Sequence, residues 1–396
     1  MDTSSRIKVR IEPDIAAIEP LQWNRCAHGD HQNDDEHTDP RNPFISAQFL
    51  TALQISGSAI PETGWAGAHI LFETPEKTLI AAVPCYLKNH SMGEYVFDHN
   101  WADAYSRVGG RYYPKLQISV PFTPATGRRM LIADPLEPSS TKDFIADAIK
   151  AVCVQQNVSS AHLTFLSQNE ANFLATKGFL TRTDQQFHWI NESYAHFDDF
   201  LTSLHSRKRK LIKRERRDAL GSGISIERLT GAEINEQHLD AFFSFYLDTG
   251  SRKWGNPYLT RSFFSLIRET MADQILLILA KRDNRYIAGA INFIGQNTLY
   301  GRNWGCIEDH PFLHFEVCYY QAIDFAIERG LKRIEAGAQG EHKLARGYRP
   351  VTTYSAHYFV DPNFRRAVES YLGKEREYVA SLHSELADHT PFKNNN

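Results

Sequence analysis

An order of predicted elements that occurs twice along the chain is the feature that most constrains its fold. The first half contains three strand-like runs separated by turn residues, at 66–73, 78–87 and 94–98. The second half contains a matching set, at 274–280, 286–294 and 298–305. A helical pattern and a further strand follow each set, at 140–156 and 160–165 and again at 316–329 and 331–335. The doubling predicts two similar α/β cores with mixed sheets.

The size and charge of the chain agree with two packed domains. A chain of 396 residues is long enough for two domains of about 100–200 residues each. We place the first domain at 1–195 and the second at 196–396. The net charge of −3 creates no strong overall field, so a nucleic acid or membrane partner must meet a local patch.

Cysteine spacing and apolar runs bear on the compartment. The five cysteines are scattered and form no CxxC pair, which is typical of a reducing compartment and argues against a zinc site. The first residues contain no apolar segment of the signal-peptide kind, and no run of about 18 apolar residues occurs. We therefore expect a cytoplasmic protein with no integral membrane segment and no bound metal.

The segment 98–136 shows no clear period and is rich in aromatic side chains. We interpret it as a long loop that binds an acceptor, because flat rings beside polar groups can stack on a ligand while bonding its hydroxyls or amides. The proposed ligands are Asp98, Trp101, Asp103, Tyr105, Arg111, Tyr112, Tyr113 and Lys115. The alternative is a cover over the first core. A similar cluster precedes the second meander, at Arg252, Lys253 and Trp254.

A basic tract opens the second half. Eight cations lie within the eleven residues from Arg207 to Arg217, with Glu215 as the one acid among them. Such a helix could neutralise several phosphates of a donor or meet an anionic membrane surface. The alternative is a solvated helix face. The predicted phosphate-binding residues are Arg207, Lys208, Arg209, Lys210 and Lys213.

The stretch from Glu335 to Pro350 is the predicted reacting centre. It follows a strand and crowds polar and cationic side chains between three glycines. Histidine is suited to proton transfer near neutral pH, so we predict catalytic roles for Gln339, Glu341, His342 and Lys343. We expect Glu316 and Arg346 to contact substrate. Because proximity alone can supply about 7–11 kcal/mol of a two-substrate barrier, mutation of His342 can be mild.

Several stretches together resemble the FemAB-like family of predicted N-acyltransferases, which are linked to peptidoglycan biosynthesis or recognition. They are Asn42-Pro-Phe-Ile-Ser, Glu94-Tyr-Val-Phe-Asp-His-Asn-Trp, Gly110-Arg-Tyr-Tyr-Pro-Lys, Val120-Pro-Phe-Thr-Pro, Ser206-Arg-Lys-Arg-Lys, Gly250-Ser-Arg-Lys-Trp-Gly, His314-Phe-Glu and Glu335-Ala-Gly-Ala-Gln-Gly-Glu-His-Lys. The resemblance implies two fused GNAT-like acyltransferase cores. It also implies transfer of an aminoacyl group from aminoacyl-tRNA to the amine of a cell-wall peptide precursor.

One departure bears on the donor. Acetyl-CoA enzymes of the GNAT type carry a glycine-rich pyrophosphate loop after the splayed strand, and here that position holds Cys306-Ile-Glu-Asp-His-Pro. We therefore expect no tightly bound cofactor, and a donor that is aminoacyl-tRNA or another acyl carrier. Two alternatives stay open. One is a non-catalytic protein that recognises a peptidoglycan precursor, and the other is an N-acyltransferase for a small metabolite that uses acyl-CoA or an acyl-carrier protein.

Overall fold

The computed structural model describes residues 7–29, 38–133, 138–221, 223–253, 257–337 and 340–393. These residues form two compact units. Unit 1 comprises residues up to Asp184 together with Thr352–Ser381, and unit 2 comprises Gln185–Val351 together with the residues from Leu382. This division differs from the expected boundary near 195, because Tyr354 to Phe359 pair with Leu166 to Ser160 in an antiparallel ladder of unit 1.

Unit 1 is built on two sheets. One is antiparallel, in the order β1-β3-β4-β7, and the strands of the other run in the order β15-β8-β6-β5-β2. The strands are β1 (Lys8–Glu12), β2 (Ala66–Gly67), β3 (His69–Glu73), β4 (Leu79–Val83), β5 (Cys85–Lys88), β6 (Lys115–Ile118), β7 (Leu131–Ile132), β8 (Ser160–Leu166) and β15 (Arg349–Phe359). The helices and 3-10 turns are η2 (Ile15–Ala17), α1 (Pro20–Ala27), η3 (Pro43–Ile45), α2 (Ala47–Ile55), η4 (Pro61–Thr63), α3 (His99–Arg107), α4 (Pro138–Gln155), α5 (Gln168–Thr176) and α12 (Pro362–Asp388), whose last residues belong to unit 2.

The segment 98–136 is not the long loop that its lack of period predicted. Within it lie α3, β6 and β7, and Leu116 and Ile118 of β6 join the core of unit 1. The predicted strand at 94–98 is also absent among the described residues, although Glu94, Val96 and Asp98 alternate as buried positions with exposed or half-buried neighbours. Short elements with buried polar side chains explain why no period was visible in the sequence.

Unit 2 has one sheet in the order β10-β11-β12-β13-β14-β9. Its strands are β9 (Leu180–Ile190, which starts in unit 1), β10 (Ser225–Thr230), β11 (Ile275–Arg282), β12 (Arg285–Ile294), β13 (Thr298–Cys306) and β14 (Arg333–Glu335). Its helical segments are α6 (Phe197–Ser203), α7 (Ser206–Ala219), η5 (Gly231–Glu233), α8 (Glu236–Lys253), α9 (Arg261–Met271), η6 (Ala272–Gln274), α10 (Leu313–Phe315), η7 (Glu316–Tyr320), α11 (Gln321–Glu328) and η8 (Glu341–Arg346).

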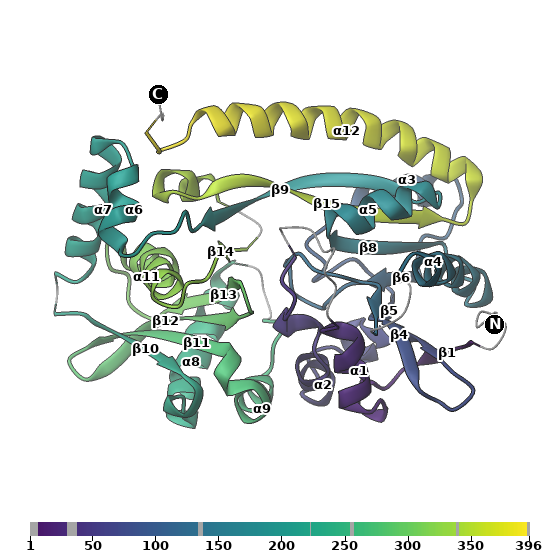
Figure 1. Cartoon of the computed structure of the whole chain (residues 1–396), viewed down its shortest axis with the longest axis horizontal. Coiled ribbons are helices and arrows are strands. Elements are labelled where there is room, and N and C mark those ends of the chain that lie inside the picture. Colours follow the sequence, from purple (N-terminus) through teal and green to yellow (C-terminus); the bar gives the residue numbers. More distant parts are fainter. Residues whose placement is uncertain are drawn as a thin grey trace. The chain divides into compact units, whose positions relative to one another are not determined.

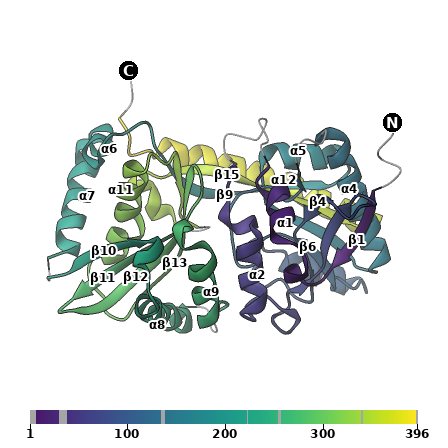
Figure 2. The same cartoon turned by 60° about the horizontal axis from the view of Figure 1, so that its bottom comes forward.

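The meander of unit 2 is the one predicted from the sequence. Strands β10 to β13 pair antiparallel, and β14 then pairs parallel to β13 after the chain has crossed through α10, η7 and α11. Helices α8 and α9 lie on one face of this sheet and α11 on the other (Figures 1 and 2). Gly305 allows the close approach of α8, because a Cβ there would lie 2.2 Å from the carbonyl oxygen of Phe245.

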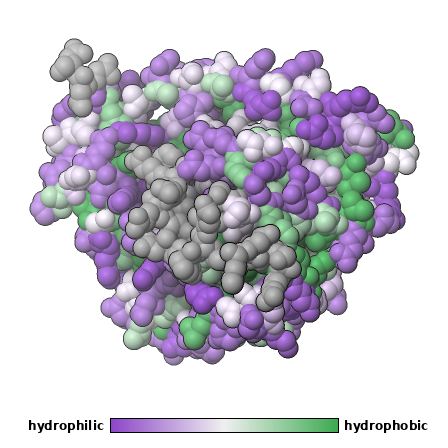
Figure 3. Space-filling view, turned by 45° about the vertical axis from the view of Figure 1, so that its right-hand side comes forward, coloured by the Kyte–Doolittle hydropathy of each residue, from purple (hydrophilic) through white to green (hydrophobic). Residues whose placement is uncertain are grey.

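Two features of the surface are plain. On the face drawn in Figure 3, hydrophilic side chains predominate and hydrophobic ones form smaller patches between them. Among the described residues, no helix has the length and apolar character needed to cross a membrane.

Candidate active site

The predicted reacting turn lies at the end of β14 and continues into the 3-10 segment η8. Gly340 precedes η8 with φ +116°, and Gly347 follows it with φ +85°. Both values favour glycine. A Cβ at Gly340 would lie 2.6 Å from Cε1 of His342, so the missing side chain leaves room for the imidazole.

Glu341 and His342, both predicted as catalytic, are exposed titratable residues at the start of η8. Nε2 of His342 lies 2.9 Å from Oη of Tyr319, which comes from the π-helical segment η7. The ring packs beside Phe315 and His314, with centroid distances of 5.8 and 6.2 Å. Desolvation is the largest cause that lowers the pKa of His342, and the charges of Arg346 and Lys343 lower it further. The imidazole is therefore neutral at neutral pH and can accept a proton.

Lys343 points away from solvent. Its Nζ donates to the carbonyl oxygens of Ala336 and Gly337 at 2.6 and 3.1 Å. Burial lowers the pKa of this amine to about 8. These contacts join Lys343 of η8 to the backbone just after β14, while its catalytic role stays a prediction.

Two predicted substrate ligands are buried in ion pairs. Arg346 is 5% exposed and pairs with Glu215 at 2.8 Å. Glu316 is fully buried and pairs with Arg216 at 3.0 Å. These ion pairs join η8 and η7 to α7, while contact of either side chain with substrate stays a prediction.

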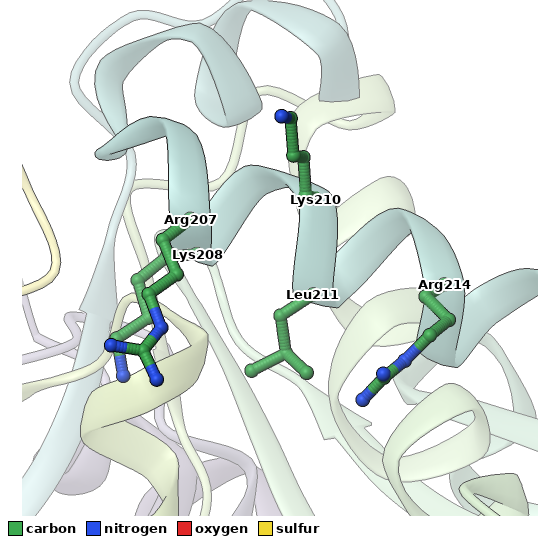
Figure 4. A pocket seen from close by; sticks show the side chains of 5 residues that line it. All are labelled: Arg207, Lys208, Lys210, Leu211 and Arg214. Atoms are coloured by element: carbon green, nitrogen blue, oxygen red, sulfur yellow. The ribbon is translucent and has the colours of Figure 1, made fainter.

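The basic tract forms helix α7, as predicted. Arg207, Lys208, Lys210, Leu211 and Arg214 line a cavity of about 580 Å³. Figure 4 shows Arg207, Lys208, Leu211 and Arg214 on the same side of the helix, whereas the amine of Lys210 points to the opposite side. No described carboxylate forms an ion pair with any of these four cations.

Two other predicted phosphate ligands do not line this cavity. Lys213 pairs with Asp198 at 3.3 Å, and Arg209 is half-buried. The cavity instead includes Arg214, which the sequence analysis did not single out as a ligand. Arg207, Lys208 and Arg214, which lie on the same side of α7 as Leu211, form a site suited to an anion such as a phosphate chain.

Four of the residues predicted to bind an acceptor lie close together in unit 1, but their side chains are buried: Asp98, Trp101, Tyr112 and Lys115. Lys115 is fully buried and donates to Ser91 Oγ at 2.8 Å, Glu94 Oε2 at 2.7 Å and Asp98 Oδ2 at 2.5 Å. Tyr112 Oη donates to Asp98 Oδ2 at 2.6 Å. Burial is the largest single influence and would raise the pKa of Asp98, but the charges of Lys115 and His162 and the hydrogen bonds from Lys115 and Ser91 together lower the pKa. Burial also raises the pKa of Glu94 to about 7.

The same network extends to a pair of buried histidines. His162 Nε2 lies 3.3 Å from Tyr112 Oη, and its Nδ1 lies 2.7 Å from Nδ1 of His357. Trp101 packs edge-on against His357 at 4.9 Å. These contacts make the network part of the interior of unit 1, so an acceptor-binding role for Asp98, Trp101, Tyr112 and Lys115 has no exposed surface to support it.

The remaining predicted ligands fall into three groups. Asp103 and Arg111 are exposed. Tyr105 donates to Asp361 at 3.1 Å, and Tyr113 bonds Ser91 at 2.8 Å. Gln339 and Trp254 lie outside the described residues, as do the side chains of Arg252 and Lys253.

Sequence reasoning missed the partners that organise the site. Tyr319 lies in a predicted helix rich in aromatic residues, where core packing is the ordinary interpretation. Glu215 stands out in the sequence as the one acid of the basic tract, but the sequence does not indicate that its side chain is buried. Glu94, His162 and His357 carried no signal that separated them from ordinary strand or loop residues.

Comparison with known proteins agrees with the fold just described. The sequence matches the FemAB-like family, described as peptidoglycan biosynthesis/recognition, over residues 14–394. The chain therefore belongs to the FemAB-like family. No curated protein sequence matches it.

Solved structures give the fold of this family member. FemX aligns over 89% of this chain and 98% of its own, with 13% identity and a TM-score of 0.55. A conserved protein of unknown function from Bacteroides thetaiotaomicron VPI-5482 aligns over 89% and 100%, with 11% identity and a TM-score of 0.53. A tandem GNAT protein from the clavulanic acid biosynthesis pathway aligns over 90% and 99%, with 9% identity and a TM-score of 0.47. The likeness to FemX and the strand order confirm the predicted class, an α/β chain with mixed sheets.

Proposed function

We propose that this protein transfers an acyl or aminoacyl group to an amine of a peptidoglycan precursor or related peptide, with His342 as the proton acceptor. The observation that carries the proposal is the exposed imidazole of His342, held by Tyr319 at 2.9 Å at the end of β14. Membership of a family described as peptidoglycan biosynthesis/recognition supports the acceptor class.

The reaction needs one proton acceptor and one proton donor. The amine nitrogen attacks the acyl carbonyl carbon and passes a proton to His342, while the bond from that carbon to the carrier oxygen or sulfur breaks. The imidazolium can then return the proton to the leaving oxygen or sulfur. When Nε2–H of His342 donates to Tyr319 Oη, Nδ1 is left as the accepting atom. The lowered pKa of His342 keeps this atom unprotonated before the reaction.

Helix α7 supplies the second part of the proposal. Its cavity of about 580 Å³, lined by four cations, is suited to the phosphates of a donor such as aminoacyl-tRNA. Near the usual acetyl-CoA loop, Glu308 instead pairs with Arg282 at 2.8 Å, and a carboxylate there opposes a pyrophosphate. We therefore favour a phosphate-bearing donor held by α7 over acetyl-CoA held at β13.

Donor binding tests this assignment. The purified protein is mixed with radiolabelled aminoacyl-tRNA at low and high salt, and in parallel with long- and short-chain acyl-CoA. The proposal predicts salt-sensitive tRNA binding that weakens when Arg207, Lys208 and Arg214 are changed to glutamine. Binding of acyl-CoA alone would reassign the donor. If a precursor bound and no donor was consumed, the protein would be a recognition module.

A further inference from the structure

Helix α7 has an inner face that contacts the candidate active site. Ile212, Glu215 and Ala219 are its buried residues, whereas the cations of the cavity lie on the outer faces. Glu215 is 3% exposed and directly follows Arg214 of the cavity. A carboxylate in the middle of a basic helix, turned into the core, needs cationic or hydroxyl partners to offset its burial.

Both carboxylate oxygens of Glu215 have such partners. Oε1 accepts from Nη2 of Arg346 at 2.8 Å, and Oε2 accepts a short hydrogen bond from Oη of Tyr320. Arg346 belongs to η8 and Tyr320 to η7. The side chain of Glu215 therefore bonds both η7 and η8, the two elements that form the candidate active site.

Each of these contacts continues to the Tyr319–His342 pair. Nη1 of Arg346 donates to the carbonyl oxygen of His342 at 2.7 Å, and its guanidinium lies 3.3 Å from the ring centroid of Phe315. Tyr320 is the chain neighbour of Tyr319, whose Oη bonds the imidazole. Glu215 thus fixes the backbone of His342 through Arg346 and the position of Tyr319 through Tyr320.

A second set of ion pairs also joins α7 to η7 and α11. Arg216 pairs with Glu316 at 3.0 Å and with Asp324 at 2.7 Å. Adjacent residues of opposite charge, Glu215 and Arg216, therefore bind α7 to η8, η7 and α11. A displacement of the helix by a ligand on its outer face must act on these contacts.

We propose that Glu215 is a positioning residue that couples anion binding in the α7 cavity to the Tyr319–His342 pair. The inference rests on the proposed function for the roles of the two sites, but the coupling can be measured without turnover. Because such coupling is reciprocal, anion binding and protonation of His342 favour each other by the same factor. The other groups that face the imidazole are Lys343 and Arg346 of its own element, Tyr319 of η7 and His314 of α10.

The test follows the imidazole by NMR. Protein with ¹⁵N-labelled histidine is titrated from pH 5 to 9 with and without saturating inorganic tripolyphosphate, and His342→Gln identifies the signal. We expect tripolyphosphate to raise the pKa of His342 by about 0.3–0.5, which corresponds to a two- to threefold change in affinity between the two protonation states.

Variants separate coupling through Glu215 from a direct field effect. Glu215→Gln should keep tripolyphosphate affinity within about twofold while losing most of the pKa shift, and Tyr320→Phe, which keeps the ring, should lose part of it. Asp218→Asn is the control. Asp218 is exposed and lies three residues after Glu215 in α7, so this variant should keep the full pKa shift of His342. An equal shift in wild type, Glu215→Gln and Tyr320→Phe would overturn the proposal. So would tripolyphosphate binding that leaves His342 unchanged, or no binding at all. None of these outcomes depends on whether the protein transfers an acyl group.

Discussion

Oη of Tyr319 and Nε2 of His342 lie 2.9 Å apart, and they join a π-helical segment to the 3-10 turn that follows β14. π-Helical turns are rare and occur frequently at functional sites. Here the π segment sets Tyr319 against His342 and, one residue later, Tyr320 against Glu215. The contact with Tyr319 engages Nε2 of His342, so Nδ1 is the nitrogen that remains to accept a proton.

The first prediction concerns His342 itself. In a transfer assay, His342→Gln should lower kcat by roughly 10²-fold, because it removes the proton acceptor. Tyr319→Phe should lower kcat by about fivefold, which corresponds to the loss of one hydrogen bond of about 1 kcal/mol. His310→Gln is the control, since His310 bonds Glu308 at 2.9 Å. If His342→Gln and Tyr319→Phe were both as active as the control His310→Gln, His342 would not be the proton acceptor.

Gly340 gives a second prediction. Gly340→Ala adds backbone strain at φ +116° and puts a Cβ 2.6 Å from the imidazole of His342. We expect lower activity together with a changed His342 NMR signal. Gly330→Ala is matched, because Gly330 also has positive φ but its Cβ would meet nothing within 4 Å. If both variants lost activity equally, strain alone would account for the effect.

The cations of α7 give a third prediction. Changing Arg207, Lys208 and Arg214 together to glutamine should weaken binding of tRNA. It should also reduce the slope of log affinity against log salt by roughly 2–3. Substitution of the exposed Arg285, Arg329 and Lys332 makes the same change in net charge elsewhere in unit 2 and should have little effect. A similar loss in both triple variants would indicate nonspecific attraction.

A fourth prediction concerns the stability of unit 1. Lys115→Met removes the amine that pairs with both Glu94 and Asp98 and leaves Glu94 with the more distant Lys88 at 3.9 Å, so we expect a loss of roughly 3–5 kcal/mol in the free energy of unfolding. Lys150→Met removes a partly exposed cation that pairs with Asp147 and should cost less than about 1 kcal/mol. Urea unfolding followed by circular dichroism measures both. A small effect of Lys115→Met would mean that the network is not stabilised by this amine.

Lys343 gives a pH-dependent prediction. Its folded pKa of about 8 lies below the ordinary value of 10.5. Between these values the unfolded chain holds a proton that the folded chain lacks, so the free energy of unfolding rises with pH across this window. Relative to Lys343→Met, wild type should gain up to about 3 kcal/mol from pH 8 to 10.5. Parallel stability curves for the two proteins would contradict a neutral buried amine.

The regular parts of the fold were predictable because their patterns are local. Strands β11 to β13 alternate or run apolar between clear turns, and α7 is a dense run of good helix formers. The pairing of β15 with β8 joins Tyr354 to Leu166, and no local pattern records such a distant partner. That is why the division into units was not found from the sequence.

The candidate site was found only in part, for the same reason. His342 and Lys343 stand out because they crowd a glycine-rich turn. Their directions do not follow from that crowding, and Lys343 turns inward to Ala336 and Gly337. In 98–136, Tyr112 and Lys115 were interpreted as a binding surface because flat rings beside polar groups can stack on a ligand. Mutual hydrogen bonding with Asp98 allows them to be buried instead.

Single-turnover transfer is the measurement that tests the central claim most directly. Radiolabelled aminoacyl-tRNA and acyl-CoA are each mixed with the protein and with peptidoglycan precursors that carry a free amine. Wild type and His310→Gln are predicted to move label onto the precursor amine, whereas His342→Gln should do so at least about 10²-fold more slowly. Label transfer at the wild-type rate by His342→Gln would contradict the account. So would precursor binding by wild type with no transfer from any donor.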